Sequence, residues 1–191
     1  TLMLLNHKSA IEFMVDAVPT EGITVPVIVD LQAKLMRDLL RDSRDIGSIR
    51  RRVVNIDGSV YTPSSIPTLL EETLNAIVDK VRNIRNPVEA AFFLWVNLAY
   101  LQPFADGNKR TSRLSANMPL MLYNCAPLSF LDVERSDYAT AMLGVYEQRN
   151  VAAAVDLFEF IYRRSIQKYG VLRASLSAPD PIRTKYRQTL N

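Results

Sequence analysis

The stretch that decides the fold is residues 102–113, which read Gln-Pro-Phe-Ala-Asp-Gly-Asn-Lys-Arg-Thr-Ser-Arg. An apolar run, residues 90–101, precedes this stretch, and the apolar residues after it keep helical spacing: Leu114, Met118, Met121 and Leu122. The pattern predicts that one helix ends, a short loop turns at Gly107, and a second helix begins near Lys109. The free backbone N–H groups at such a helix start, together with the helix dipole, favour an anion.

Charged side chains in the same stretch indicate what that anion is. Lys109, Arg110 and Arg113 add positive charge, and the i, i+3 spacing puts the two arginines on one side of the helix. Asp106 supplies an oxygen ligand of the kind that suits Mg²⁺ shared with phosphate oxygens. Together these residues predict a pocket for a nucleotide polyphosphate; the structural alternative is a capped helix start with surface arginines.

Outward from this stretch the chain is predicted to be mostly helical, with one short β element. Helical spacing of apolar residues covers residues 11–18, 25–40, 68–81, 88–101, 137–146 and 151–168, with Gly170 expected to end the last helix. Pro119 predicts a kink or a break. Residues 53–61 hold β-branched runs on both sides of Asp57-Gly58, which is a hairpin signal.

Composition narrows the class of protein. The 191 residues are 48% hydrophobic, enough for one domain with a substantial core. One cysteine and one histidine, His7, exclude a disulfide framework, a Cys-rich zinc site and a His–His metal motif. The longest apolar run is shorter than the ~20 residues that span a bilayer, and no secretion signal opens the chain. We therefore expect a cytoplasmic protein with no membrane partner. Because the chain begins at Thr1, we expect it to be a piece of a longer protein.

Charge gives only weak support for a nucleic-acid partner. The net charge is +3, and no winged-helix pattern or base-reading helix is apparent, so we consider nucleic-acid binding unlikely for this domain. The basic run Arg50–Arg52 is expected on a solvated face. The more specific alternative is that it binds an acidic partner or a phosphate. Residues 171–191 form a basic tail, either a linker or a docking segment.

The stretch around Gly107 resembles the signature of the Fic family (filamentation induced by cAMP), His-x-Phe-x-Asp/Glu-Gly-Asn-Gly/Lys-Arg-x-x-Arg. The matching positions are Phe104, Asp106, Gly107, Asn108, Lys109, Arg110 and Arg113. Residues 6–13 are similar to an N-terminal helix of that family, and residues 49–63 to its flap, a hairpin that docks a target protein. The resemblance implies an all-α, Fic-type helical bundle with one short β-hairpin flap, over residues 1–170.

The resemblance also implies a function. Most Fic proteins transfer AMP from ATP to a hydroxyl side chain of a target protein, so ATP and Mg²⁺ are the expected cofactors. Asp106 would hold Mg²⁺. The phosphate nest would be formed by Gly107, Asn108, Lys109 and Arg110, and Arg113 would contact the outer phosphates. Tyr138 and Tyr146 would wall the adenine pocket. Val60 and Tyr61, in the flap, would hold the target by strand addition, and related folds often form homo-oligomers.

The sequence departs from the signature at its first position, where Gln102 replaces histidine. In the family that histidine is the general base that takes the proton from the attacking hydroxyl. A glutamine amide can hydrogen-bond a hydroxyl but has no basic lone pair near neutral pH. We therefore predict nucleotide binding with AMP transfer absent or very slow.

Three explanations of Gln102 stay open. In the first, the fold serves binding or regulation and has no transferase activity. In the second, the protein transfers a group with another base, or from a nucleotide-type donor whose transfer needs no base. In the third, Gln102 is an engineered replacement of histidine. Two hypotheses concern other classes of protein. One is a regulator that associates with nucleic acid through flanking domains outside this chain, and the other is a purely structural interaction module. His7 lies in a different predicted helix and is expected to pack or to start that helix.

Overall fold

The computed structural model describes residues 1–131 and 133–177. In that part of the chain the regular structure is entirely helical, which confirms the all-α prediction. The elements are α1 (Leu2–Glu21), α2 (Val25–Met36), the short 3₁₀ helix η1 (Ser43–Asp45), α3 (Pro67–Asn83), α4 (Pro87–Leu101), α5 (Asn108–Ser115), α6 (Asn117–Leu122), α7 (Arg135–Gln148) and α8 (Ala152–Ser177).

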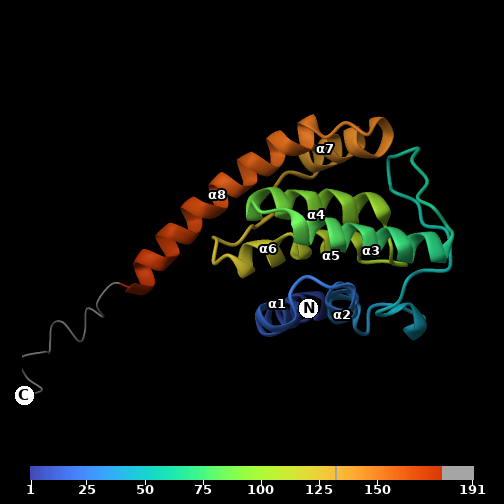
Figure 1. Cartoon of the computed structure of the whole chain (residues 1–191), viewed down its shortest axis with the longest axis horizontal. Coiled ribbons are helices and arrows are strands. Elements are labelled where there is room, and N and C mark those ends of the chain that lie inside the picture. The colour runs from blue at the N-terminus through green and yellow to red at the C-terminus, as the bar shows by residue number, and fades with distance from the viewer. Residues whose placement is uncertain (132, 178–191) are drawn as a thin grey trace, which may run out of the picture.

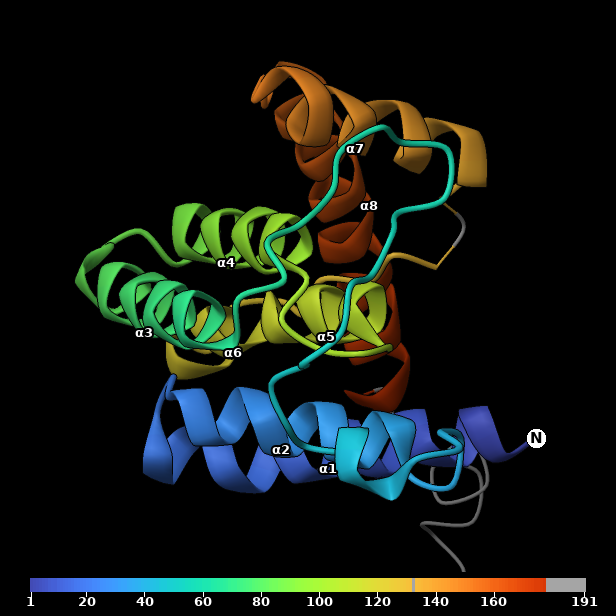
Figure 2. The same cartoon turned by 90° about the vertical axis from the view of Figure 1, so that its right-hand side faces the viewer.

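Helix α4 lies at the centre of the bundle. Figures 1 and 2 show α1 and α2 side by side on one flank, α3 to α6 in the middle, and α7 with α8 on the other flank. Two apolar clusters fill the spaces between these layers, and α4 contributes to both, with Leu94 and Leu98 in one and Trp95 and Ala99 in the other. A helix that is apolar on most sides is buried on most sides, so the central position of α4 follows from its sequence.

Two helix boundaries, one before and one after the signature, follow from local sequence. Helix α4 begins at Pro87, where Asn86 Oδ1 accepts the N–H groups of Val88 (2.9 Å) and Glu89 (3.4 Å). The predicted break at Pro119 is confirmed, because α5 ends at Ser115, four residues before the proline, and α6 begins at Asn117. A proline ring clashes with the carbonyl four residues earlier, which places the break there.

The last helix is longer than predicted. Helix α8 runs through Gly170 to Ser177, so residues 171–177 of the predicted tail continue that helix. One interior glycine costs a helix only about 1 kcal/mol, and Gly170 therefore does not end it. The remaining part of the tail, residues 178–191, lies outside the described residues. Among the residues that are described, no helix combines the length and the apolar character that a bilayer crossing needs.

The predicted β-hairpin flap is wrong. Residues 51–66, which we call the flap loop, contain no strand. The turn itself forms, since Ser59 N–H donates to the Ile56 carbonyl at 3.1 Å. The backbone beyond the turn bonds elsewhere: Val60 N–H donates to Glu147 Oε1 on α7 at 3.0 Å. An isolated two-stranded hairpin is only marginally stable, and here side chains of the bundle take the backbone groups that a ladder would use.

Candidate functional site

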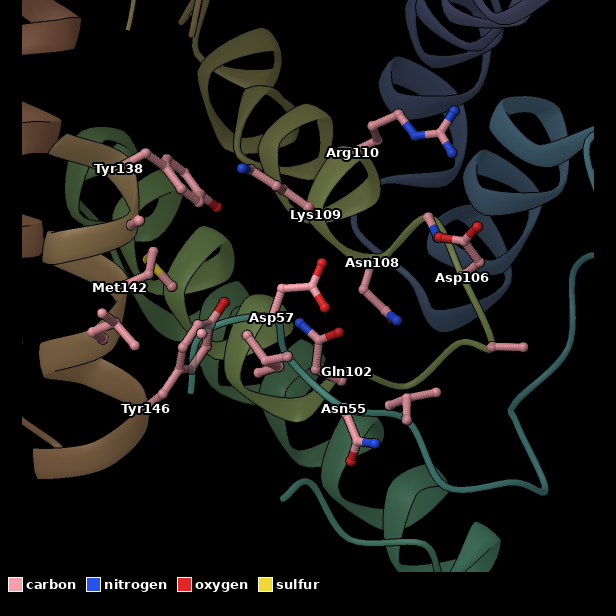
Figure 3. A pocket seen from close by; sticks show the side chains of 17 residues that line it. Asn55, Asp57, Gln102, Asp106, Asn108, Lys109, Arg110, Tyr138, Met142 and Tyr146 are labelled. Atoms are coloured by element: carbon pink, nitrogen blue, oxygen red, sulfur yellow. The ribbon is translucent and has the colours of Figure 1, made fainter. Parts of the chain in front are cut away.

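A cavity of about 500 Å³ opens at the N-terminus of α5. Residues 54–58 of the flap loop form one wall, residues 102–107 and the first turn of α5 a second, and α7 a third. Figure 3 shows side chains from all three walls pointing into the same space, among them Asp57, Gln102 and Lys109. The signature stretch, the flap loop and α7 are far apart in sequence, and the fold brings them together.

The first turn of α5 presents free backbone donors to this cavity. Gly107 precedes the helix with φ +82°, and the first helical bond joins Thr111 N–H to the Gly107 carbonyl at 2.8 Å. No acceptor for the backbone N–H groups of Asn108, Lys109 and Arg110 is found in the part of the chain that the structure describes. These three residues line the cavity, so its wall has the backbone donors and the dipole of an anion site.

Buried contacts fix the shape of the signature loop. The Asn108 side chain closes the loop on itself: its Oδ1 accepts Phe104 N–H at 2.9 Å, and its Nδ2 donates to the Phe104 carbonyl at 2.7 Å. The Gln32 side chain donates to the Asp106 carbonyl at 3.1 Å. A Cβ on Gly107 would lie 2.7 Å from Met36 Sδ, so only glycine fits the close approach of α2. The backbone cradle is therefore preorganised.

Asp106 lies on the cavity wall with an exposed side chain. Its Oδ1 accepts the N–H of Gly107, so part of the carboxylate already caps the loop. One further oxygen remains, and Mg²⁺ in nucleotide sites is commonly held by one or two carboxylates together with phosphate oxygens. No group of three or more His, Cys, Asp or Glu side chains within residues 1–131 and 133–177 could enclose a metal. The donor set fits an ion held jointly with a phosphate.

The Lys109 ammonium faces both the cavity and the ring of Tyr138. Its Nζ lies 4.2 Å from the ring centroid, and the Arg113 guanidinium lies 4.0 Å from the same centroid. Burial, together with the charges of Arg113 and Arg135, lowers the pKa of Lys109. Arg113 does not itself line this cavity; its guanidinium lies between Tyr138 and Phe130, 5.0 Å from the Phe130 ring centroid.

Arg110 connects the cavity to a second one on its far side. Its side chain points toward α1 and α2 (Figure 3), with Nη2 2.9 Å from Met36 Sδ. Arg110 and Arg113 both line the second cavity, of about 510 Å³, as the predicted shared face requires. His7 lines the second cavity and not the first, so it is not placed to replace the missing signature histidine.

Gln102 occupies the C-terminus of α4, at the floor of the cavity. Its backbone is left-handed (φ +49°), and its Nε2 donates to the Ala99 carbonyl at 2.6 Å, which satisfies a free carbonyl of the last helical turn. Its own carbonyl accepts Arg50 Nε at 2.6 Å. Gln102 thus caps the helix, and its amide provides no titrating group to the cavity.

The two tyrosines predicted to wall the adenine pocket do lie on the cavity wall, on α7. Tyr138 is 4% exposed and Tyr146 is 8% exposed. Burial raises the pKa of Tyr146, with smaller contributions from Tyr138 and Tyr61, so its phenol stays protonated and is no substitute base. The α7 wall is apolar, with Met142 between the tyrosines (Figure 3).

The predicted docking residues of the flap lie outside the cavity. Val60 is 86% exposed, and its N–H is bound to Glu147. The Tyr61 ring stacks on Tyr100 with centroids 4.5 Å apart, and its hydroxyl donates to the Tyr100 carbonyl at 3.2 Å. Tyr61 therefore holds the flap loop against α4.

Sequence reasoning missed two residues of the flap region. Arg50 was expected on a solvated face, but it is 0% exposed, and its guanidinium donates to the carbonyls of Gln102, Arg52 and Ser64. Asp57 was noted only as part of a turn signal, yet it lines the cavity. A run of three arginines does not distinguish the buried one. For Asp57, the usable signal is an acidic residue at the tip of a predicted turn within the segment that resembles the flap.

Comparison with known proteins agrees with this architecture. Protein adenylyltransferase Fic of Nematostella vectensis is 32% identical over 146 residues, which cover 74% of this chain and 31% of that protein. The protein of the same name from Aedes aegypti is 26% identical over 167 residues, covering 84% of this chain and 32% of that one. The chain thus spans about a third of the length of these curated relatives.

Solved structures show the same fold. Fic-1 (residues 134–508) from C. elegans superposes with a TM-score of 0.74 at 24% identity, covering 91% of this chain and 52% of that chain. The BepC protein of Bartonella tribocorum, with bound AMPPNP, superposes with a TM-score of 0.62 at 14% identity, covering 84% and 85%. The sequence model of the Fic/DOC family matches residues 22–120, more than half of the chain. The chain therefore belongs to the Fic/DOC family.

Proposed function

We propose that this domain binds a nucleoside triphosphate with its phosphates on the N-terminus of α5, and that Gln102 leaves AMP transfer absent or very slow. The observation that carries the proposal is the row of free backbone N–H groups at Asn108, Lys109 and Arg110, which face the cavity. The names of the curated relatives, which are protein adenylyltransferases, and the AMPPNP bound to BepC support this choice of ligand.

Each signature residue has a role in this proposal. The α5 amides and Lys109 would bind the phosphates, and Asp106 would hold Mg²⁺ together with phosphate oxygens. The ion would neutralise the negative charge of the phosphates, which the Asp106 carboxylate would repel if no ion lay between them. Outer phosphates that extend past the helix start toward the second cavity would meet Arg110 and Arg113, which both line it. Tyr138 and Tyr146 would face the nucleoside.

The family's reaction shows what Gln102 removes. The oxygen of a target hydroxyl attacks the α-phosphorus of ATP, the new O–P bond forms, and the bond to the β-phosphate oxygen breaks to release diphosphate. The hydroxyl proton must go to a base near the end of α4. The Gln102 amide cannot take that proton, and a positioned base is typically worth about 10²–10⁴ in rate. Phosphate binding uses other groups, so it should survive the change.

The target protein would dock beside the flap loop, where Val60 is exposed. Because residues 51–66 contain no strand, strand addition would require this segment to straighten on binding. We propose that the bound target, rather than the helical bundle, holds this segment in an extended conformation, as in other cases of strand addition.

Two measurements test the proposed function. Calorimetric titration of ATP, with and without Mg²⁺, should show binding by the unmodified chain; no binding at millimolar nucleotide would refute the site. The second measurement follows labelled AMP from ATP onto proteins of a lysate, with Gln102→His as the matched variant. We expect the variant to label at least about 10²-fold faster than the unmodified chain. Rapid labelling by the unmodified chain would instead establish the alternative, a transferase with another base.

A further inference from the structure

Asp57 stands at the tip of the flap loop, on the cavity wall formed by residues 54–58. The turn that carries it closes with the bond from Ser59 N–H to the Ile56 carbonyl at 3.1 Å. Glu147 of α7 then holds the turn, because its Oε1 accepts both the Ser59 hydroxyl (2.8 Å) and Val60 N–H (3.0 Å). The side chain of Asp57 points into the cavity (Figure 3).

The base of the flap loop is held as firmly as its tip. The buried Arg50 guanidinium donates to the Arg52 carbonyl at 2.8 Å and to the Ser64 carbonyl, one on each arm of the loop, and to the Gln102 carbonyl at the end of α4. Both arms are therefore fixed to the same helix end that forms the cavity floor. The position of Asp57 is thus set by contacts at both ends of the loop.

The Asp57 carboxylate has no hydrogen bond or ion pair with any residue in the described part of the chain. Other acids near the site have structural tasks: Asp106 caps Gly107 N–H, and Glu147 binds the turn. An ionised carboxylate has only acceptor sites. Any ligand group that contacts Asp57 must therefore be a hydrogen-bond donor or carry positive charge.

The walls of the cavity differ in character, which bears on what can face Asp57. The first turn of α5 carries the backbone amides and Lys109, with Asp106 just before it, whereas the α7 wall is apolar and aromatic (Figure 3). The two walls meet where Lys109 Nζ lies 4.2 Å from the Tyr138 ring centroid. The turn of Asp57 is bound to α7. A phosphate in direct contact with this carboxylate would be repelled, whereas the nucleoside carries hydroxyl and N–H donors, so the nucleoside is the part of the nucleotide that suits Asp57.

We propose that Asp57 is a specificity-determining residue that accepts hydrogen bonds from the nucleoside of the bound nucleotide, through ribose hydroxyls or N–H groups of the base. This inference rests on the proposed nucleotide binding. The flap loop would then contribute to ligand specificity, in addition to any contact that it makes with a target protein. Asp57 is exposed in the free protein, so it discriminates to the extent that the bound nucleotide shields the carboxylate from water and a competing ligand then leaves it unpaired.

The test compares ligands with and without a nucleoside. ATP, GTP, 2′-deoxy-ATP and inorganic triphosphate, each with Mg²⁺, are titrated into the unmodified chain, Asp57→Ala, Asp57→Asn and the control Asp79→Ala. Asp79 is the same residue type, lies exposed on α3 and does not line the cavity. We expect Asp57→Ala to weaken the best nucleotide by roughly tenfold or more, as for loss of a hydrogen bond to a charged group, and to leave inorganic triphosphate as tight or tighter.

The outcomes separate the possibilities. A tenfold loss shared by ATP and GTP but absent with 2′-deoxy-ATP assigns the 2′-hydroxyl as donor, and a loss shared by all three nucleotides but absent with inorganic triphosphate assigns the 3′-hydroxyl. A loss that differs between ATP and GTP assigns the N–H groups of the base. If Asp57→Ala changes nucleotide and inorganic triphosphate by the same factor, or changes neither, the carboxylate does not contact the nucleoside and the inference is overturned. If the unmodified chain binds inorganic triphosphate but no nucleotide more tightly, the inference also fails while the phosphate site stands. Binding of neither ligand refutes the proposed function itself.

Discussion

Replacing Arg50 tests how the flap loop is held at the cavity. Arg50 is fully buried, and its three side-chain hydrogen bonds all go to backbone carbonyls, those of Gln102, Arg52 and Ser64. Burial lowers the pKa of this guanidinium, which shows that part of the benefit of the three bonds is offset by desolvation of the charge. Only the difference between these two effects contributes to stability.

The magnitude of that difference can be estimated. Arg50→Ala removes the desolvation cost but leaves three carbonyls without their donor, each worth about 1–3 kcal/mol when buried. These carbonyls are partly buried, so water entering the space left by the side chain recovers some of the loss. We expect the free energy of unfolding to fall by about 3 kcal/mol, which corresponds to about 6–12 °C in Tm for a domain of this size.

The assay is urea and thermal unfolding of Arg50→Ala, Arg50→Lys and Arg51→Ala, with amide hydrogen exchange of residues 51–66. The neighbouring Arg51 is exposed, so its replacement should change stability by less than about 0.5 kcal/mol. Arg50→Lys should fall between the two, because a shorter ammonium cannot reach all three carbonyls. If Arg50→Ala matches Arg51→Ala in stability and its flap loop exchanges no faster, the three bonds do not hold the loop.

Two other sites give sharp expectations. Gly107→Ala should lower the free energy of unfolding by about 2 kcal/mol, because φ is +82° and the new Cβ would lie 2.7 Å from Met36 Sδ. If the losses from Gly107→Ala and Met36→Ala simply add in the double variant, the predicted clash between the two side chains is refuted. Burial and the charge of Arg110 lower the pKa of His7 from 6.5, so the unfolded chain binds more protons below that pH. Stability should therefore fall as pH drops from about 7 to 5, more steeply than in His7→Gln, and parallel pH curves would exclude this linkage.

The signature loop could be predicted from sequence because its constraints are local. The proline and asparagine at the start of α4, the glycine before α5 and the proline in α6 each act within a few residues, and the structure places the boundaries accordingly. The flap loop could not be predicted this way. Its Asp57-Gly58 turn forms as the local sequence indicates, but whether its arms pair depends on Arg50 and Glu147, and Glu147 lies almost ninety residues from the turn.

The signature match supports ligand binding better than it supports catalysis, for a reason visible in the contacts. Several signature residues build the loop: Phe104 is buried, Asn108 closes the loop, and Gly107 allows the approach of α2. The groups left for a ligand are the backbone amides of α5 and the side chains of Asp106, Lys109, Arg110 and Arg113. None of them depends on the identity of residue 102. Gln102 itself makes a helix-capping contact with the Ala99 carbonyl. A sequence can therefore lose the base and keep the phosphate cradle intact, which is why binding and transfer need separate measurements in this domain.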